Sequence, residues 1–219
     1  LSQDIDALGD GDIGWSLVLD PSGKVDSWGR VQRVDGQRFL LDVDSGFGAA
    51  LIARLERFRL RVDVGIRPTD EVIGAPLDWP GLEGDDERSR ILAGLPRLGA
   101  ELTADTIPAE AGATVIERSV SFTKGCYTGQ ELVARVDSRG NNTPRNLYGV
   151  VAPVGVDLAE AEVFTDGEAV GAITSAAASA ELGSIGLAYV RRGAAVPGVA
   201  EIKTLAGDRL EARVESLPV

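Results

Sequence analysis

The side chain with the most distinctive chemistry in the sequence is Cys126, the single cysteine of the chain. It lies in the segment Lys124-Gly125-Cys126-Tyr127-Thr128-Gly129-Gln130-Glu131. Residues 128–131 have the form of a capping box, which predicts a helix that begins there and runs to about Val136. The positive end of that helix dipole and the ammonium group of Lys124 would both favour a reactive, negatively charged sulfur. The pattern therefore suggests a reactive or sulfur-handling cysteine, with a small buried hydrophobic residue as the alternative.

The absence of histidine limits the chemistry that this cysteine could share with other side chains. Histidine is the commonest general base and metal ligand, so Cys–His and Ser–His hydrolases are excluded. One thiol cannot form an internal disulfide or complete a closed metal site, and we predict no bound metal. A lone thiol also fits a reducing compartment, and we expect the protein to be cytoplasmic.

The charge of the chain restricts its partners. Its 34 acidic and 22 basic residues give a net charge of −12, with a pI near 4.5. A surface of this sign repels phosphate backbones, so we predict no direct nucleic-acid partner. No apolar run approaches the roughly 18 residues that a membrane-spanning helix needs, and we expect no membrane partner.

A group of arginines leaves room for a small anionic ligand despite the negative net charge. Arg135 and Arg139 are four residues apart and would share a helix face, although an ordinary solvated face fits this spacing equally well. The stretch that holds the group contains Arg118, Arg135, Arg139 and Arg145.

The first third of the chain has the pattern of a β-β-α-β unit. Short apolar strands are predicted at residues 16–19, 31–34 and 39–43, with the turn sequences Asp20-Pro21-Ser22-Gly23 and Asp35-Gly36. Ser45 could cap a helix with Leu51, Leu55 and Phe58 on one face. Alternating apolar residues then predict a further strand at 60–66. Such units are typical of an α+β layer.

The rest of the chain divides into a loop-rich part and an apolar tail. Residues 67–86 read as a loop, residues 86–93 as a short helix that ends at Gly94, and residues 119–123 as a short strand. From residue 147 onward, short apolar runs alternate with Gly, Asp and Pro, which indicates a small β-barrel. We therefore predict an α+β domain over residues 1–145 and a β-barrel domain over residues 146–219.

The segment at residues 124–131 resembles the K-G-C-Y-x-G-Q-E signature of the YgfZ family. This family is paralogous to the glycine-cleavage T-protein, an aminomethyltransferase. Family-like sequence continues on both sides, at residues 107–110, 121–123, 133–135 and 139–140, and again in the tail at residues 171–175 and 187–192. The likeness covers most of the chain. It implies an α+β, T-protein-like folate-binding core followed by a small C-terminal β-barrel.

The resemblance also implies a function. It suggests non-covalent binding of tetrahydrofolate and an accessory role in assembling or repairing iron–sulfur clusters in client enzymes, some of which modify tRNA. Folate and these client enzymes would be the partners, and we expect a monomer. Cys126 would be the working thiol, in the position of a catalytic residue. The folate contacts carried over by resemblance are Arg90, Lys124, Tyr127, Gln130, Glu131 and Arg135.

The alternative function is folate-dependent aminomethyl transfer of the T-protein type. In the T-protein, a G-G-x-x-D-D-type segment supplies an aspartate beside the folate. The segment at residues 23–28 here resembles it but has Ser27 at that position. Asp26 would face the other way, because adjacent strand residues point to opposite sides. We therefore expect an accessory protein that binds folate, rather than an enzyme, with a thiol-redox or ligand-sensing module as a third class.

Overall fold

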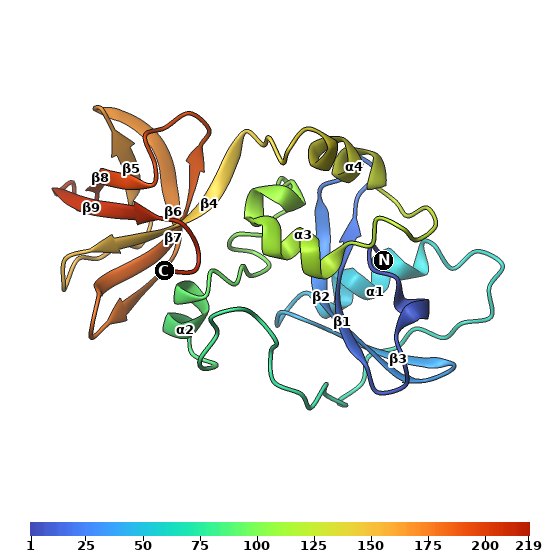
Figure 1. Ribbon diagram of the computed structural model, residues 1–219. Coiled ribbons are helices and arrows are strands. Elements are labelled where there is room, and N and C mark those ends of the chain that lie inside the picture. Colours follow the sequence, from blue (N-terminus) through green and yellow to red (C-terminus); the bar gives the residue numbers. More distant parts are fainter. The chain divides into compact units, whose positions relative to one another are not determined.

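The computed structural model describes residues 1–219, and the chain forms two compact units. Unit 1 contains residues 1–75, 102–109 and 113–141, and unit 2 contains residues 76–101, 110–112 and 142–219. The ribbon in Figure 1 follows the chain through both units. The two units are interleaved along the chain. The predicted boundary between two domains at residue 145 stays a prediction.

Unit 1 is built on a three-stranded antiparallel sheet. Its strands are β1 (Ile13–Leu19), β2 (Val25–Asp35) and β3 (Arg38–Val43), in the order β1-β2-β3. In the turn between β1 and β2, the Gly23 amide donates to the Asp20 carbonyl at 3.0 Å. The turn between β2 and β3 follows Asp35, which pairs with Arg38. Both hairpins predicted from the turn sequences are confirmed.

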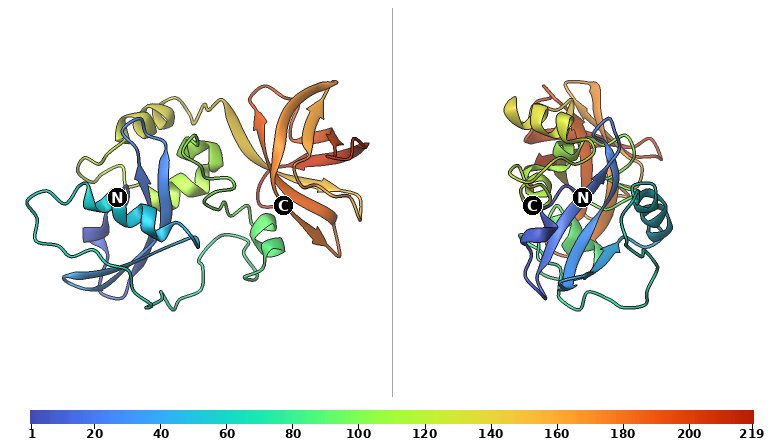
Figure 2. Two further views of the ribbon diagram at one scale, coloured as in Figure 1. Left: turned by 180° about the vertical axis from the view of Figure 1, so that it is seen from behind. Right: turned by 90° about the vertical axis from the view of Figure 1, so that its right-hand side faces the viewer.

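The helices of unit 1 cover the two faces of this sheet. On one face, Trp15 and Trp28 stack with ring centroids 4.3 Å apart, and the Trp28 indole donates to the Ser119 hydroxyl at 2.8 Å. Ser119 ends α3 (Ala113–Ser119), which packs against β1 (Figures 1 and 2). On the other face lies α1 (Gly48–Glu56), whose Leu51 is buried. A short 3-10 helix, η1, spans Ile5–Ala7.

Two expectations for residues 45–66 are wrong. The helix α1 begins at Gly48 with Phe47 as its N-cap and no side-chain cap, so Ser45 does not cap it, and Phe58 lies beyond its end with 52% of its surface exposed. The strand predicted at residues 60–66 is absent, and Leu60 is 75% exposed. An alternating pattern forms a strand only where a neighbour pairs with it, and the sheet contains no strand that does so.

The segment before the last helix of unit 1 also differs from expectation. Residues 120–129 contain no strand, so the strand predicted at 119–123 is wrong. Helix α4 (Gln130–Ser138) begins two residues later than predicted, with Gly129 as its N-cap. No side chain caps it, so the capping box of Thr128 and Glu131 does not form.

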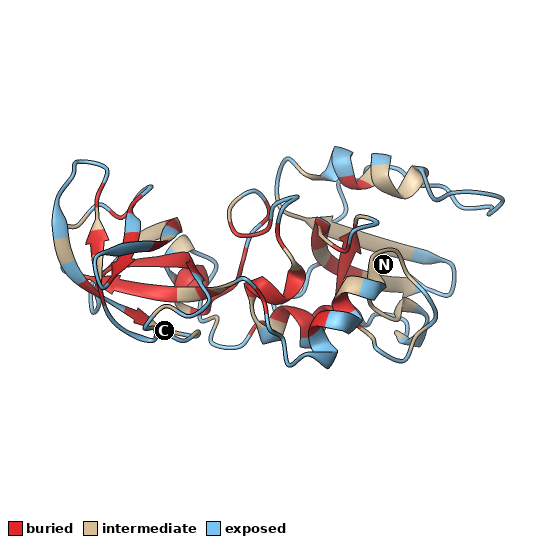
Figure 3. Cartoon of the chain, turned by 90° about the horizontal axis from the view of Figure 1, so that it is seen from above, coloured by how far each residue is buried: buried red, intermediate tan, exposed pale blue.

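Unit 2 contains the predicted β-barrel. Its strands are β4 (Arg145–Ala152), β5 (Glu162–Thr165), β6 (Glu168–Ser179), β7 (Gly183–Arg191), β8 (Gly198–Lys203) and β9 (Arg209–Glu215). They close in the order β4-β7-β6-β5-β8-β9. Figure 3 shows that much of the barrel's strand length is coloured as buried. Val150, Val163 and Ile202 belong to its apolar core. The barrel is confirmed.

A short arm of unit 2 packs on the barrel. It contains α2 (Glu87–Leu92), whose N-cap Asp86 accepts a hydrogen bond from the Ser89 amide at 2.6 Å, so the helix predicted at 86–93 is confirmed. Ile91 of this helix is fully buried in a cluster with Leu187 and Tyr189 of the barrel. A 3-10 helix, η2 (Pro108–Ala111), comes later in the chain.

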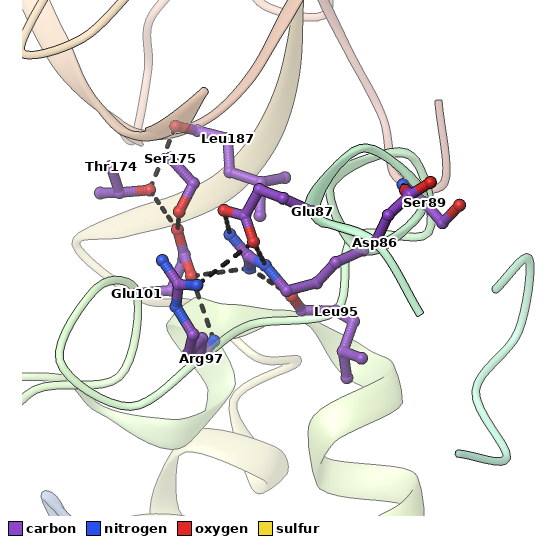
Figure 4. A network of polar contacts seen from close by, with 10 residues as sticks. Asp86, Glu87, Ser89, Leu95, Arg97, Glu101, Thr174, Ser175 and Leu187 are labelled. Carbon is purple, nitrogen blue, oxygen red and sulfur yellow. Dashed lines mark hydrogen bonds and ion pairs between the residues drawn. The ribbon is translucent and has the colours of Figure 1, made fainter. Parts of the chain in front are cut away.

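The carboxylate of Glu101 is fully buried between this arm and the barrel (Figure 4). From the arm, Arg90 Nη1 and the Arg97 amide both donate to its Oε2 at 3.1 Å. From β6, the hydroxyls of Thr174 and Ser175 donate to its Oε1 at 2.7 and 2.6 Å. Four donors and one opposite charge make the burial of this charge tolerable.

A bulge in β6 makes this arrangement possible. Consecutive strand residues normally point to opposite faces, but the pairing of β6 with β7 shifts between Ile173 and Ser175. Both hydroxyls therefore reach the same carboxylate. Arg90 also donates to Glu87 at 2.7 Å, and this hydrogen bond holds the pKa of the Glu87 carboxyl below its usual value.

Replacing Glu101 should destabilise unit 2 strongly. In Glu101→Ala the Arg90 charge loses its fully buried partner, and breaking such a pair costs about 3–5 kcal/mol. The matched control is Glu168→Ala, which removes the exposed partner of Arg191 and should cost no more than about 1 kcal/mol. Urea unfolding followed by circular dichroism measures both, and equal losses would contradict the importance of this network.

Candidate functional site

The loop at residues 120–129 joins α3 to α4 and carries the only thiol of the chain. The Cys126 side chain is exposed, so it is not the small buried hydrophobic residue considered as an alternative. The next residue, Tyr127, is partly buried, and this burial raises the pKa of its phenol. The loop thus presents one thiol to solvent beside a largely neutral aromatic side chain.

Lys124 ties this loop to the first residues of the chain. Its Nζ donates to the carbonyl oxygens of Leu1 and Gln3 at 2.9 and 3.0 Å. Its backbone amide donates to the Ser121 hydroxyl at 3.2 Å. The ammonium group also lies 5.9 Å from the centre of the Tyr127 ring. In this structure, therefore, Lys124 has a clear positioning role.

Gln130 and Gly129 hold the other end of the loop. The Tyr127 amide donates to Gln130 Oε1 at 3.1 Å, which closes the turn before α4. Gly129 has φ of +81°, and a Cβ built on it would lie 2.7 Å from the Asp20 carbonyl oxygen. A Cβ on Gly23 would lie 2.5 Å from the Leu132 Cβ. The turn between β1 and β2 therefore touches the start of α4 through two glycines.

The remaining predicted contacts divide between the two units. Glu131 and Arg135 are exposed on α4 in unit 1, near the loop in the sequence. Arg90 belongs to unit 2, where its guanidinium binds Glu87 and Glu101. Six of the seven predicted site residues thus belong to one loop and the helix after it, and only Arg90 lies elsewhere.

The arginine group expected from the sequence is likewise divided. Arg145 belongs to unit 2, pairs with Glu110 at 3.1 Å and stacks over the Tyr189 ring at 4.2 Å. Arg118, Arg135 and Arg139 belong to unit 1. Arg145 therefore has a structural role within its own unit.

A second feature of unit 1 is a small hollow over the sheet, which the sequence did not reveal. Its lining comes from β1, β2, β3, Leu1 and Leu51, and it has room for about one water molecule. Ser27 lies in this lining with 3% of its surface exposed, and its hydroxyl has no hydrogen-bond partner. A buried polar group without a partner is costly and rare, so a ligand or a water is expected to satisfy it.

Asp26 does not share this position. The register of β1 and β2 shifts between Val18 and Leu19, which pair with Ser27 and Val25, so Asp26 has no residue opposite it. Its carboxylate instead lies 2.7 Å from Arg54 Nε on α1. The carboxylate next to Ser27 in the sequence is therefore absent from the lining of the hollow.

A charged pair lies on the opposite face of the sheet. In the register Ser27 is opposite Val18 and Arg30 is opposite Trp15, so the Ser27 and Arg30 side chains point to opposite sides. Arg30 Nε donates to Asp42 Oδ2 at 3.1 Å, and its Nη1 donates to the Ala75 carbonyl oxygen at 2.7 Å. The hollow thus combines one neutral hydroxyl with apolar strand residues. Such a lining suits the polar edge of a flat ring better than a free anion.

The chain resembles known proteins along most of its length. Residues 145–219 match the glycine cleavage T-protein C-terminal barrel domain. An uncharacterized protein of Haemophilus influenzae is 29% identical over 172 residues, which cover 65% of this chain and 61% of that protein. The tRNA-modifying protein YgfZ of Yersinia pestis is 48% identical over 58 residues, which cover 26% of this chain and 17% of that protein.

One solved structure has the same fold. The glycine cleavage system aminomethyltransferase T from Bartonella henselae aligns with a TM-score of 0.75 and 18% identity, covering 99% of this chain and 78% of that chain. Together these matches support a YgfZ-family assignment. The chain has the T-protein-like fold with a C-terminal barrel that its sequence predicted.

None of the helices combines the length and apolar character needed to cross a lipid bilayer. Nowhere do three or more acidic or cysteine side chains gather so that they could hold a metal ion.

The close approach at Gly129 can be tested by alanine substitution. Gly140, just beyond the other end of α4, also has positive φ, but a Cβ there would meet nothing within 4 Å. Gly140→Ala should cost about 1 kcal/mol, from backbone strain alone. Gly129→Ala adds a clash with backbone and should cost at least about 2 kcal/mol. Thermal unfolding compares the two, and equal costs would show that the contact with the turn is unimportant.

Proposed function

We propose that this protein binds tetrahydrofolate and serves as an accessory protein in the assembly or repair of iron–sulfur clusters of client enzymes. Its family and its fold relate it to folate-binding proteins. Some relatives are called tRNA-modifying proteins, and we include tRNA-modifying enzymes among the clients. The cluster belongs to the client, and Cys126 is the working thiol.

The observation that carries the folate proposal is the unpartnered hydroxyl of Ser27. The resemblance of residues 23–28 to a T-protein segment assigns Ser27 the place of the aspartate that lies beside the folate in that family. The hydroxyl can donate to or accept from the polar edge of a pterin ring. The Ser27 hydroxyl therefore suits the polar edge of this ligand. The hollow itself has room for about one water molecule and does not hold a pterin ring unless one of its walls moves.

The same residue distinguishes an accessory protein from an aminomethyltransferase. A neutral hydroxyl cannot supply the carboxylate that the T-protein family places beside its folate. Asp26 does not replace it, because its carboxylate pairs with Arg54. We therefore favour ligand binding without transfer, and no structural observation favours the transferase.

The exposure of Cys126 supports its role as a working thiol. An accessible sulfur can contact iron or another sulfur in a client, whereas a single ligand cannot hold a cluster by itself. Hydrogen bonds of Lys124 and Gln130 position the two ends of the loop around it. The thiol is thus displayed to a partner.

The hollow can be tested by calorimetric titration with tetrahydrofolate. Ser27→Ala removes one hydrogen bond, worth about 0.5–1.5 kcal/mol, and should weaken binding by about 2- to 13-fold. The matched control, Asp26→Asn, changes the adjacent residue outside the hollow and should bind as the wild type does. Equal affinities for all three proteins would contradict this site, and no binding at all would contradict the folate proposal.

The thiol can be tested separately. Cys126→Ser should bind tetrahydrofolate with unchanged affinity but fail to sustain iron–sulfur enzymes in cells from which the natural protein has been removed. The activity of a tRNA-modifying iron–sulfur enzyme provides the measurement, and Asp26→Asn serves again as the control. Full activity of Cys126→Ser would remove the thiol from the proposed function.

A further inference from the structure

Residues 58–66 carry a row of apolar side chains that the rest of the chain leaves uncovered. Phe58, Leu60, Val62 and Val64 each expose between 48% and 75% of their surface. They alternate with polar residues, so an extended backbone would place all four on one face. Soluble proteins rarely expose several large apolar side chains together, and such a patch marks an interaction site. We call residues 58–66 the apolar segment.

The backbone of the apolar segment is also largely unpaired. The backbone amides of residues 61–66 donate no hydrogen bond within the chain. Two exposed hydrogen bonds maintain the present shape of the segment. The Leu60 amide donates to the Phe58 carbonyl at 2.8 Å, and Arg59 Nη1 donates to the Val64 carbonyl at 3.1 Å. Little structure is therefore lost if the segment becomes extended.

These features together indicate that the partner is another β-strand. A helix or a lipid would cover the apolar side chains but leave the backbone amides unpaired, whereas a strand satisfies both. Arg61 has φ of +61°, a left-handed conformation that is unfavourable for a residue with a side chain. The extended backbone that strand pairing requires removes this strain.

The charges of the segment select a second copy of the chain as the partner. In an antiparallel pair of two copies centred on Val62, Arg61 of each copy lies opposite Asp63 of the other. No ion pair within the chain includes Arg61 or Asp63. The apolar residues face one another in the same register, in the pairs Leu60–Val64 and Phe58–Ile66.

Other arrangements of the two copies are less favourable. A shift of the pairing by one residue brings the apolar face of one copy to the polar face of the other. Moving the centre to Arg61 or to Asp63 places two like charges opposite each other, and so does parallel pairing in register. The antiparallel register centred on Val62 avoids these conflicts.

We propose that two copies of the protein associate by antiparallel pairing of their apolar segments. The interface is isologous, because the same residues contribute on both sides of a two-fold axis. Nine residues from each copy make a small interface, so the expected Kd lies between about 1 μM and about 1 mM. The monomer expected from the sequence is then the dilute state. The pairing uses neither folate nor the thiol and is independent of the proposed function.

Sedimentation equilibrium of the full chain measures this association. The wild type should change from monomer to dimer as its concentration rises from about 1 μM to about 1 mM, and a monomer throughout this range overturns the proposal. Arg61→Asp and Asp63→Arg each place like charges opposite each other at both ends of the charged pairing. Each should weaken dimerisation by about 2- to 30-fold. The variant that combines both changes restores opposite charges and should dimerise as the wild type does.

These variants separate the register from an effect of net charge. Arg61→Asp makes the acidic protein more acidic, whereas Asp63→Arg makes it less acidic. General repulsion between copies would therefore weaken dimerisation in one variant and strengthen it in the other. Shifts in opposite directions, or a combined variant that does not recover, would overturn the proposed pairing.

The apolar face is tested at the centre of the segment. Val62→Asp brings two carboxylates together on the two-fold axis and should weaken dimerisation by at least as much as the single charge changes. The matched control is Val154→Asp, which adds the same charge at an exposed valine of unit 2 and should dimerise as the wild type does. Equal losses in the two variants would show that the apolar segment is not the interface.

Discussion

The structure of unit 1 depends on the hydrogen bonds that residues 1–3 make on two sides. Ser2 joins β1 to residues 119–121 of the chain, more than 100 residues away, and Lys124 joins the thiol loop to the residues on either side of Ser2. The loop is also held by Gln130, by the bond from the Lys124 amide to the Ser121 hydroxyl and by the glycine contact with the turn between β1 and β2. Several residues of the family signature thus act first by holding the exposed thiol in place.

Unit 2 also depends on a polar contact between residues far apart in the sequence. In unit 1 the charged group is the Lys124 ammonium, whereas in unit 2 it is a carboxylate. There a buried carboxylate, Glu101, receives an arginine from the arm and two hydroxyls from the barrel. The arm also inserts Ile91 into an apolar cluster on the barrel. In both units, therefore, residues far apart in the sequence are joined by buried polar groups whose partners are fully specified, and such groups are costly to disrupt.

The sequence predicted the elements whose signals are local. The turns at 20–23 and 35–36, the helix capped by Asp86 and the short strands of the barrel all follow from residues close together in the chain. Elements that depend on distant parts of the chain were predicted less well. A strand was predicted at 60–66, but no neighbouring strand pairs with it. The helix α3, which packs on Trp28, was not predicted, because its β-branched residues obscure the helical pattern. The capping box failed because Gly129, in a left-handed conformation, precedes the helix. The resemblance located the thiol and Ser27, but only the folded structure shows the hollow and the contacts of residues 1–3.

Hydrogen exchange of the wild-type protein with and without tetrahydrofolate tests the central claim most directly. The account predicts slower exchange at the backbone amides of Ser16, Val18 and residues 27–31, which line the hollow. Protection confined to unit 2 would contradict the claim that folate binds beside Ser27 in unit 1.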